Sequence, residues 1–176
     1  MEIIRVNEKE YQVISLLGRG KGGYSYRVTD GTQEYVLKQI HHESCDYYQF
    51  GNKLESELRD YQTLSALGLP LPLLLDVDTQ NERLLKEFID GPTLCELVEQ
   101  DEMQEDYFCQ MEAMCRILYE NGLNIDYFPT NFVVQQRKLY YIDYECNPYD
   151  MQWDFAHWGS KYWSKTPAFL TYLENR

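Results

Sequence analysis

The sequence has no long hydrophobic run. Its most apolar stretch, residues 67–77, is interrupted by Pro70 and Pro72, and it is shorter than the roughly 18 apolar residues that read as a membrane-spanning helix. Residues 1–11 also lack the basic start and the long apolar middle of a secretory signal peptide. These absences predict that the protein has no membrane partner and that its location is cytoplasmic.

The sequence also lacks paired cysteines. The cysteines are odd in number and scattered, with no CxxC pair, at positions 45, 95, 109, 115 and 146. The spacing therefore excludes a CxxC zinc or redox motif. We expect these cysteines to be reduced, and most of them to be buried as small apolar residues.

Positive charge is scarce. The formal net charge is −13, which argues against a broad nucleic-acid surface or an anionic membrane surface, because Lys and Arg supply the affinity for phosphate. Residues 87–176 carry 6 basic and 16 acidic side chains, whereas residues 1–86 carry 10 and 13. A partner that docks on the second half is therefore expected to be cationic.

The first half of the chain alternates short strand patterns with turns. Hydrophobic residues make up 44% and aromatic residues 15% of the sequence, which is typical of a globular protein of one domain or two small lobes. A helix is predicted over residues 52–67, where apolar residues recur every three or four positions, and Gly68 ends it. The predicted strands are residues 11–17, 24–28, 34–40, 73–77 and 83–88. We expect a five-stranded antiparallel lobe with one helix.

A glycine-rich loop lies between the first two predicted strands. Gly18, Gly20 and Gly23 fit the pattern GxGxxG, but a strand follows them, whereas a dinucleotide-binding fold has a helix there. A glycine-rich hairpin can close over phosphates, because backbone N–H groups approach them where side chains are missing. A merely flexible hairpin is the alternative.

Lys38 lies inside the third predicted strand, among apolar neighbours. A buried lysine needs an anionic partner. Glu57 lies beside the apolar stripe of the predicted helix and Glu55 is the competing choice. Both remain open at this point.

The pattern changes at Ile89-Asp90-Gly91-Pro92, which contains strong structure breakers and predicts a linker. We therefore divide the chain into residues 1–88, the linker 89–92 and residues 93–176. In the last part, Thr93 and Glu96 have the spacing of a helix capping box. Helices are predicted for residues 105–120, 150–163 and 167–173.

Three tryptophans, Trp153, Trp158 and Trp163, occur at intervals of five, which is too wide for one face of a helix. Core packing is the favoured interpretation because large aromatic residues dominate burial. An aromatic cage for a quaternary ammonium group is the alternative.

The most informative stretch is Gly122 to Glu145. Two short strands, residues 132–134 and 139–142, flank a polar turn and predict a hairpin. Asp126 and Asn131 precede the first strand and Asp143 ends the second, so the hairpin would gather three oxygen-bearing side chains at one end. Such oxygen ligands suit Mg²⁺ that carries nucleotide phosphates. An ordinary surface hairpin is the alternative.

The order of these features resembles the protein-kinase superfamily: a glycine loop, a strand lysine, a helix glutamate, a linker, the DxxxxN of Asp126 to Asn131, and then Asp143. The resemblance runs from about residue 16 to 159. The chain looks closest to small atypical members, namely RIO-type kinases, the KEOPS-complex kinase, lipopolysaccharide kinases, and aminoglycoside and choline phosphotransferases. It implies an α+β, two-lobed kinase-like fold with a truncated, mainly helical second lobe.

The resemblance also implies roles and cofactors. Lys38 would hold ATP phosphates and pair with Glu57, Asn131 and Asp143 would hold Mg²⁺, and Asp126 would orient the acceptor hydroxyl and take its proton. The glycines at 18, 20 and 23 would cover the phosphates, and the backbone of residues Glu87 and Ile89 would meet the adenine edge. Asp154, with Gly159 five residues on, resembles the aspartate that supports the catalytic loop in kinases.

The chain departs from the kinase pattern at several positions. Asn124 stands where many kinases have His, Phe128 replaces a lysine, and Ser25 replaces the glycine-loop valine. Asp143-Tyr144-Glu145 replaces DFG, where Tyr144 can pack as Phe does and Glu145 is interpreted as a loop residue. Asp154 follows Asp143 by 11 positions and is followed by only 22 residues. We therefore expect no activation-loop switching, no late helices of the second lobe, and an unusual acceptor platform.

The favoured function is an ATP- and Mg²⁺-dependent transferase, a serine/threonine protein kinase-like enzyme that moves the γ-phosphate to a hydroxyl. The first alternative is a kinase of small amines, aminoglycosides or choline-like compounds, which the acidic second half and the IDYE segment favour. The second alternative is a nucleotide-binding pseudokinase without catalysis.

Overall fold

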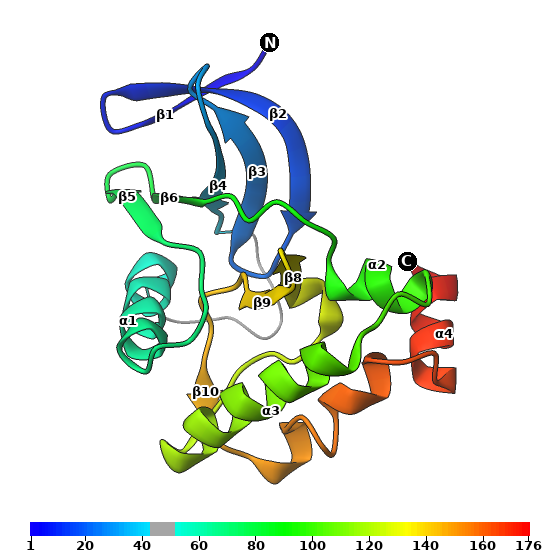
Figure 1. Ribbon diagram of the computed structural model, residues 1–176. Coiled ribbons are helices and arrows are strands. Elements are labelled where there is room, and N and C mark those ends of the chain that lie inside the picture. Colours follow the sequence, from blue (N-terminus) through cyan, green and yellow to red (C-terminus); the bar gives the residue numbers. More distant parts are fainter. Residues whose placement is uncertain (43–51) are drawn as a thin grey trace. The chain divides into compact units, whose positions relative to one another are not determined.

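The chain forms two compact units. The computed structural model describes residues 1–42 and 52–176 (Figure 1), so Cys45, one of the five cysteines, lies outside the described residues. The first unit contains Met1–Arg59 and Pro72–Phe88, and the second contains Asp60–Leu71 and Ile89–Arg176. With a large antiparallel sheet and several helices, the chain is of the α+β class.

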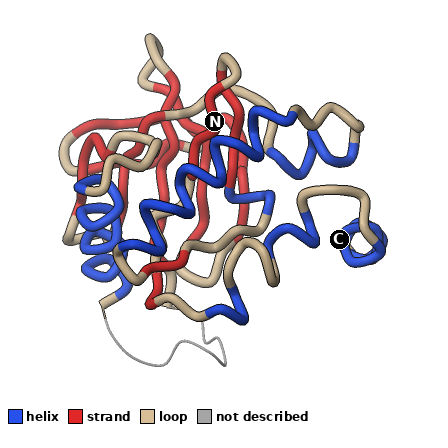
Figure 2. The backbone as a smooth tube through the Cα atoms, turned by 60° about the horizontal axis from the view of Figure 1, so that its bottom comes forward, coloured by secondary structure: helices blue, strands red, loops and turns tan. Residues whose placement is uncertain are grey.

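The first unit is built on one antiparallel sheet, whose strands are the adjacent red segments of Figure 2. The strands, in spatial order, are β1 (Ile3–Val6), β2 (Lys9–Arg19), β3 (Gly23–Thr29), β4 (Glu34–Ile40), β6 (Arg83–Glu87) and β5 (Leu74–Asp78). The prediction of five strands was therefore wrong, because the sheet has six. The missed strand β1 joins β2 through a turn at Asn7, whose φ is 54°. Its turn contains neither glycine nor proline, so the usual hairpin signal is absent.

The two faces of this sheet bury different clusters, because side chains alternate along each strand. Leu37 of β4 belongs to a buried cluster with Val6, Tyr11, Val28 and Leu85. Ile40 instead packs with Leu84 and with Leu54 of helix α1 (Lys53–Ala66). Lys38 shares its face with Ile40, and so it lies on the side of the sheet that α1 covers.

The second unit confirms the predicted helices at residues 93–120. Thr93 and Glu96 form the capping box of α2 (Leu94–Glu99). Helix α3 (Glu105–Glu120) buries one face, which includes Met111 and Met114. Apolar residues three and four apart thus form a buried helix stripe.

The central hairpin is also confirmed, as β8 (Phe132–Gln135) paired with β9 (Lys138–Tyr141). Its turn residues Gln136 and Arg137 have φ values of 49° and 66°, which is the two-residue turn that matches strand twist. A two-residue ladder joins β7 (Leu123–Asn124) to β10 (Asn147–Pro148).

The prediction of one helix over residues 150–163 was wrong. The structure has two 3₁₀ turns there, η2 (Met151–Trp153) and η3 (Gly159–Tyr162). Side-chain oxygens take the backbone donors instead: Asp150 accepts from the N–H of Gln152, and Asp154 accepts from the N–H of His157 at 2.8 Å. Such local hydrogen bonds compete with helix formation. The final predicted helix is confirmed as α4 (Pro167–Asn175), capped by Thr166.

The tryptophans and cysteines follow their predictions only in part. Trp163 is fully buried, whereas Trp153 is 50% exposed, so core packing holds for one and is wrong for the other. The free cysteines among the described residues are two buried ones, one partly buried and one exposed, namely Cys95, Cys115, Cys146 and Cys109.

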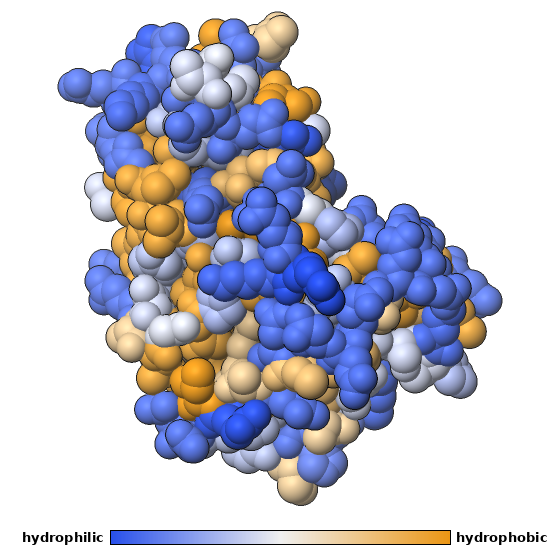
Figure 3. All heavy atoms as spheres, in the orientation of Figure 1, coloured by the Kyte–Doolittle hydropathy of each residue, from blue (hydrophilic) through white to orange (hydrophobic). Residues whose placement is uncertain are grey.

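Polar residues predominate on the face drawn in Figure 3, with apolar residues in small groups among them. Across residues 1–42 and 52–176, no helix combines the length and the apolar character that crossing a membrane requires.

Candidate active site

The glycine loop is a tight hairpin that continues the sheet. Gly18 pairs with Ser25, and the Gly20 N–H donates to the Gly23 carbonyl at 2.8 Å. A Cβ at Gly23 would lie 2.3 Å from the carbonyl oxygen of Gln39. Only glycine fits that close approach of two strands.

Lys38 and Glu57 form a buried ion pair in the first unit. The Lys38 Nζ lies 2.8 Å from Glu57 Oε1, and the two side chains are 13% and 8% exposed. Glu55, the competing candidate, is exposed. The helix period explains the choice, because Glu57 follows the buried Leu54 by three residues and so shares its face.

The glycine loop reaches this lysine. A Cβ on Gly22 would lie 3.8 Å from the Lys38 Nζ. The loop is held there by His41, whose N–H donates to the Gly22 carbonyl at 3.1 Å, and by Lys53, whose Nζ donates to the Lys21 carbonyl at 3.2 Å. The loop, the lysine and the glutamate therefore form one constellation within the first unit.

In the second unit, hydrogen bonds link Asn131 both to Asp126 and to the residue before Asp143. The Asn131 Nδ2 donates to the Asp126 carbonyl at 3.3 Å, and the Asn131 carbonyl accepts from the N–H of Ile142 at 2.9 Å. The Asp126 carboxylate accepts from the N–H of Phe128 at 3.1 Å, and the Asp143 carboxylate accepts from the N–H of Tyr144 at 2.9 Å. The three predicted residues thus come from one end of the β8–β9 hairpin.

Tyr141 also contributes to this end of the hairpin, although no motif in the sequence marks it. Its fully buried hydroxyl accepts from the Asp126 N–H at 3.4 Å and donates to the Glu145 carbonyl at 2.9 Å. Burial, followed by the nearby Asp143 and Glu145 carboxylates, raises the pKa of Tyr141 well above its ordinary value. The phenol therefore stays protonated and keeps donating. The only available signal was its place two residues before Asp143 in a predicted strand.

The loop that carries Asp126 is supported from behind by aromatic packing. Tyr127 is fully buried, and the indole N–H of Trp163 donates to its carbonyl at 2.8 Å. A Cβ on Gly159 would lie 2.5 Å from the Tyr127 Cβ and 3.1 Å from the Phe155 ring. Only glycine at position 159 therefore lets its segment pack this closely against Tyr127.

Asp154 supports its own turn. It is 4% exposed and accepts from the Tyr149 hydroxyl at 2.9 Å and from the backbone N–H and ring Nδ1 of His157, both at 2.8 Å. Burial by itself raises the pKa of this carboxyl, but the hydrogen bonds from His157 and Tyr149 outweigh burial and hold the pKa below its ordinary value. Its place behind the loop of Asp126, suggested by the resemblance, stays a prediction.

The structure shows the surroundings of three residues that depart from the kinase pattern. Tyr144 is 1% exposed and packs on Tyr61 with ring centroids 4.5 Å apart, so it does pack as an apolar aromatic residue. Glu145 is exposed. Phe128 lies among aromatic residues, 4.8 Å from Tyr172 and 5.0 Å from Tyr162 between ring centroids.

Asn131 and Asp143 are the residues predicted to hold Mg²⁺, and their role as ligands stays a prediction. In residues 1–42 and 52–176, no group of three or more His, Cys, Asp or Glu could hold a metal ion. One carboxylate from Asp143 and the side-chain oxygen of Asn131 are instead the kind of small oxygen set that Mg²⁺ uses when phosphates and waters complete its shell.

The residues predicted to meet adenine lie at the end of β6. Glu87 is its last residue, and its N–H donates to the Leu73 carbonyl at 2.9 Å. Ile89 follows two residues later and is 6% exposed. Their contact with adenine stays a prediction.

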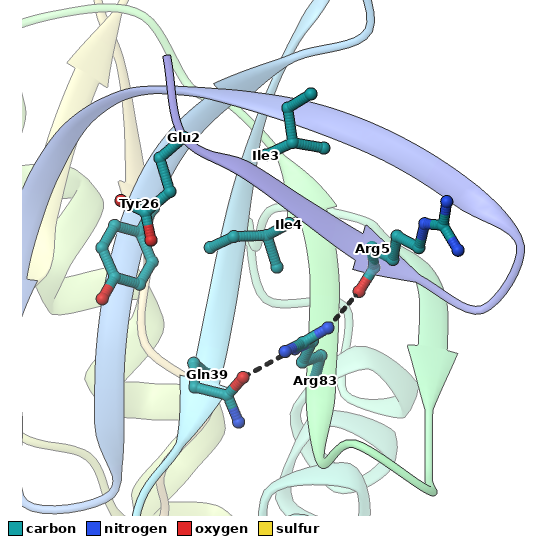
Figure 4. Close-up of a pocket in the computed structure, with 7 residues that line it drawn as sticks. All are labelled: Glu2, Ile3, Ile4, Arg5, Tyr26, Gln39 and Arg83. Atoms are coloured by element: carbon teal, nitrogen blue, oxygen red, sulfur yellow. Dashed lines mark hydrogen bonds between the residues drawn. The ribbon is translucent and has the colours of Figure 1, made fainter.

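A separate pocket of about 490 Å³ in the first unit is lined by residues of β1, β3, β4 and β6 (Figure 4). Arg83 crosses it, donating to the Gln39 side chain and to the Arg5 carbonyl, both at 2.6 Å. Gln39 is the neighbour of Lys38 in β4, so the two side chains point to opposite faces of the sheet. This pocket is therefore not part of the Lys38 constellation.

The chain resembles one curated protein at low identity. It is 25% identical over 130 residues to the KEOPS complex subunit Bud32 of Pyrococcus abyssi (strain GE5 / Orsay), a match that covers 72% of this chain and 59% of that protein. The chain thus spans less than two thirds of the relative's length. No protein-family model matches the sequence. The likeness supports the resemblance to the protein-kinase superfamily at a coarse level.

Proposed function

We propose that this protein is an ATP- and Mg²⁺-dependent phosphotransferase with a reduced protein-kinase-like fold, and that it phosphorylates a hydroxyl group, most simply that of a protein Ser or Thr. The observation that carries the proposal is the buried ion pair of Lys38 and Glu57 beneath the glycine loop. Burying a charged pair costs desolvation energy, and a plain hairpin has no need of it. A phosphate-binding site does need a fixed cation of this kind.

The hairpin end favours transfer over simple nucleotide binding. We assign Asn131 and Asp143 to Mg²⁺ and Asp126 to the acceptor. The low-identity match to the KEOPS subunit Bud32 adds support. The glycines at 18, 20 and 23 would admit the phosphates, residues Glu87 and Ile89 would face the adenine, and 89–92 would be the linker.

In the proposed reaction, the acceptor oxygen forms a bond to the γ-phosphorus of ATP while the bond from that phosphorus to ADP breaks. The Asp126 carboxylate orients the hydroxyl and takes its proton. When bound, Mg²⁺ neutralises charge on the phosphate oxygens. Lys38, held in place by Glu57, neutralises further phosphate charge, and such preorganised charge is a large part of catalysis.

The test is phosphoryl transfer from labelled ATP and Mg²⁺ by the purified full chain, measured as autophosphorylation, transfer to generic protein acceptors, or slow ATP turnover. Asp126→Asn should lower the rate by at least about 100-fold, the usual contribution of a general base, while ATP still raises the melting temperature. Glu112→Gln, an exposed carboxylate of α3, is the matched control and should retain activity.

A silent wild type whose melting temperature ATP still raises would refute the transferase and leave a nucleotide-binding pseudokinase. A chain that ATP does not stabilise at all would refute both. One observation favours the second enzymatic candidate, a kinase of small hydroxylated amines. It is an acidic pocket beside Asp126.

A further inference from the structure

A pocket of about 270 Å³ opens beside Asp126 in the second unit. Besides Asp126, its lining includes Glu145, Asp150, Trp153 and Trp158. Sites for drug-sized ligands occupy about 300–1,000 Å³. This pocket is therefore of a size for a single small group, such as one side chain or a small amine.

The charge of the lining has one sign. Three carboxylates line the pocket, and its described lining residues include no Lys, Arg or His. The same sign extends over residues 87–176, which carry 6 basic and 16 acidic side chains. A concave site lined by one sign of charge concentrates ligands of the opposite sign, so the pocket favours a cation.

The two indoles supply a second, independent preference for a cation. Trp153 and Trp158 lie edge to face, with ring centroids 5.9 Å apart and planes at 69°. Trp158 is held in turn by Tyr162, whose ring centroid is 5.5 Å away. The face of an indole ring attracts ammonium and guanidinium groups, with Trp the strongest of the aromatic side chains.

Trp153 and Trp163 differ in their exposure to solvent, so one belongs to the core and the other is available to a ligand. Trp163 is fully buried and its N–H is bonded to the Tyr127 carbonyl, so it serves the core. Trp153 is 50% exposed, although a large aromatic ring gains most from burial. A half-exposed indole at the wall of an acidic pocket suits a ligand that covers it.

We infer that this pocket binds the cationic group, an ammonium or a guanidinium, of the acceptor whose hydroxyl is phosphorylated. The inference rests on the proposed function, because it takes Asp126 as the residue that meets the hydroxyl. Since Asp126 itself lines the pocket, the cation and the hydroxyl are only a few bonds apart in the ligand. A free amino alcohol and a basic side chain beside a Ser or Thr share this chemistry.

Binding is tested on the full chain without ATP, by tryptophan fluorescence titration with two matched pairs of probes. The first pair is choline and its neutral isostere 3,3-dimethylbutan-1-ol. The second is an N-acetylated arginyl-serine amide and the same N-acetylated peptide with citrulline in place of arginine, which carries no charge. In at least one pair, the cation should bind about tenfold more tightly than the neutral probe. The pair that shows this preference tells whether the acceptor is a free amino alcohol or a peptide with a basic side chain.

Two variants localise the effect. Glu145→Gln and Trp153→Leu should each weaken cation binding at least about threefold, and circular dichroism checks that both are folded. Glu112→Gln, exposed on α3, should leave it unchanged. The inference is overturned if neither cation binds below about 10 mM, if the neutral probes bind equally well, or if Glu112→Gln weakens binding as much as Glu145→Gln.

The phosphotransfer assay keeps this inference separate from the proposed function. Transfer from ATP to neutral and cationic acceptors alike, with no binding preference for the cations, would refute the cation pocket and leave the transferase. Cation binding that Glu145→Gln weakens, in a chain that transfers phosphate to no acceptor, would support the pocket and refute the transferase.

Discussion

Replacing Glu57 by Gln isolates the contribution of the buried ion pair. The change keeps the size of the side chain and one oxygen acceptor, but it removes the charge opposite Lys38. Because Lys38 is only 13% exposed, water cannot replace the lost carboxylate fully. We therefore expect the unfolding free energy to fall, and nucleotide-dependent stabilisation to fall with it.

The magnitude follows from the geometry. At the separation of 2.8 Å and an effective dielectric constant of about 20, the gross attraction is about 6 kcal/mol. Desolvation offsets much of this, and removing one partner of a buried pair costs about 3–5 kcal/mol. Since glutamine still accepts a hydrogen bond from the lysine, we expect a loss of about 3 kcal/mol. With a urea m-value of about 2 kcal/mol/M, the unfolding midpoint falls by about 1.5 M.

Urea titration followed by far-UV circular dichroism measures the effect. Glu55→Gln is the control, because it makes the same chemical change on the same helix at an exposed position, and it should cost less than about 0.5 kcal/mol. A double variant, Lys38→Met with Glu57→Gln, should be more stable than the sum of its single changes predicts by at least about 1 kcal/mol. Equal losses for the two glutamates, or strict additivity in the double variant, would refute the reasoning.

Three further predictions concern the second unit. Gly159→Ala should lower the unfolding free energy by about 1–3 kcal/mol in urea titration, because the new Cβ would lie 2.5 Å from the Tyr127 Cβ. Trp163→Phe should cost about 1–3 kcal/mol in the same assay, because it leaves the buried Tyr127 carbonyl without its indole donor. Asp154 has a folded pKa below its ordinary value of 3.8, so its stabilisation is present above that pH and is lost as pH falls through the folded pKa. Asp154→Asn should therefore make the urea midpoint depend less on pH between about 5 and 2.5.

Controls for these predictions come from the same chain. Gly18→Ala meets no atom within 4 Å and should leave stability nearly unchanged, so an equal loss at Gly18 and Gly159 would contradict the steric explanation. For the tryptophan, no loss in Trp163→Phe would show that its hydrogen bond is dispensable. For the carboxylate, an unchanged pH slope in Asp154→Asn would show that other groups dominate acid unfolding.

Local patterns in the sequence predicted most of the regular structure. The capping residues Thr93 and Glu96 are adjacent to the helix they begin, so their spacing was sufficient. The same holds for the β8–β9 hairpin, whose strands are separated by two residues. Strand β1 has no such marker, because its turn relies on Asn7 in a left-handed conformation.

Features that depend on side-chain geometry could not be predicted. Periodicity placed both Glu55 and Glu57 on the helix, but the partner of Lys38 depends on which of them faces the sheet. Residues 150–163 were predicted to form a helix, whereas the Asp154 side chain accepts from a backbone N–H, that of His157, which a helix would use in its own hydrogen bonds. The role of Tyr141 depends on the Asp126 N–H and the Glu145 carbonyl, which only the fold brings close to its hydroxyl.

The short ladder between β7 and β10 limits how far the chain after Asp143 can move. Asn147 pairs with Asn124. The chain from Asp143 to Asn147 advances four residues, so it spans at most about 14 Å even when fully extended. A phosphorylation switch needs a segment with two stable arrangements, and this one is pinned beside the strand that leads to Asp126. If the proposed transfer takes place, we expect an enzyme that is not regulated by phosphorylation of this segment. Its reaction rate would then depend on the amount of protein and on the concentration of its acceptor.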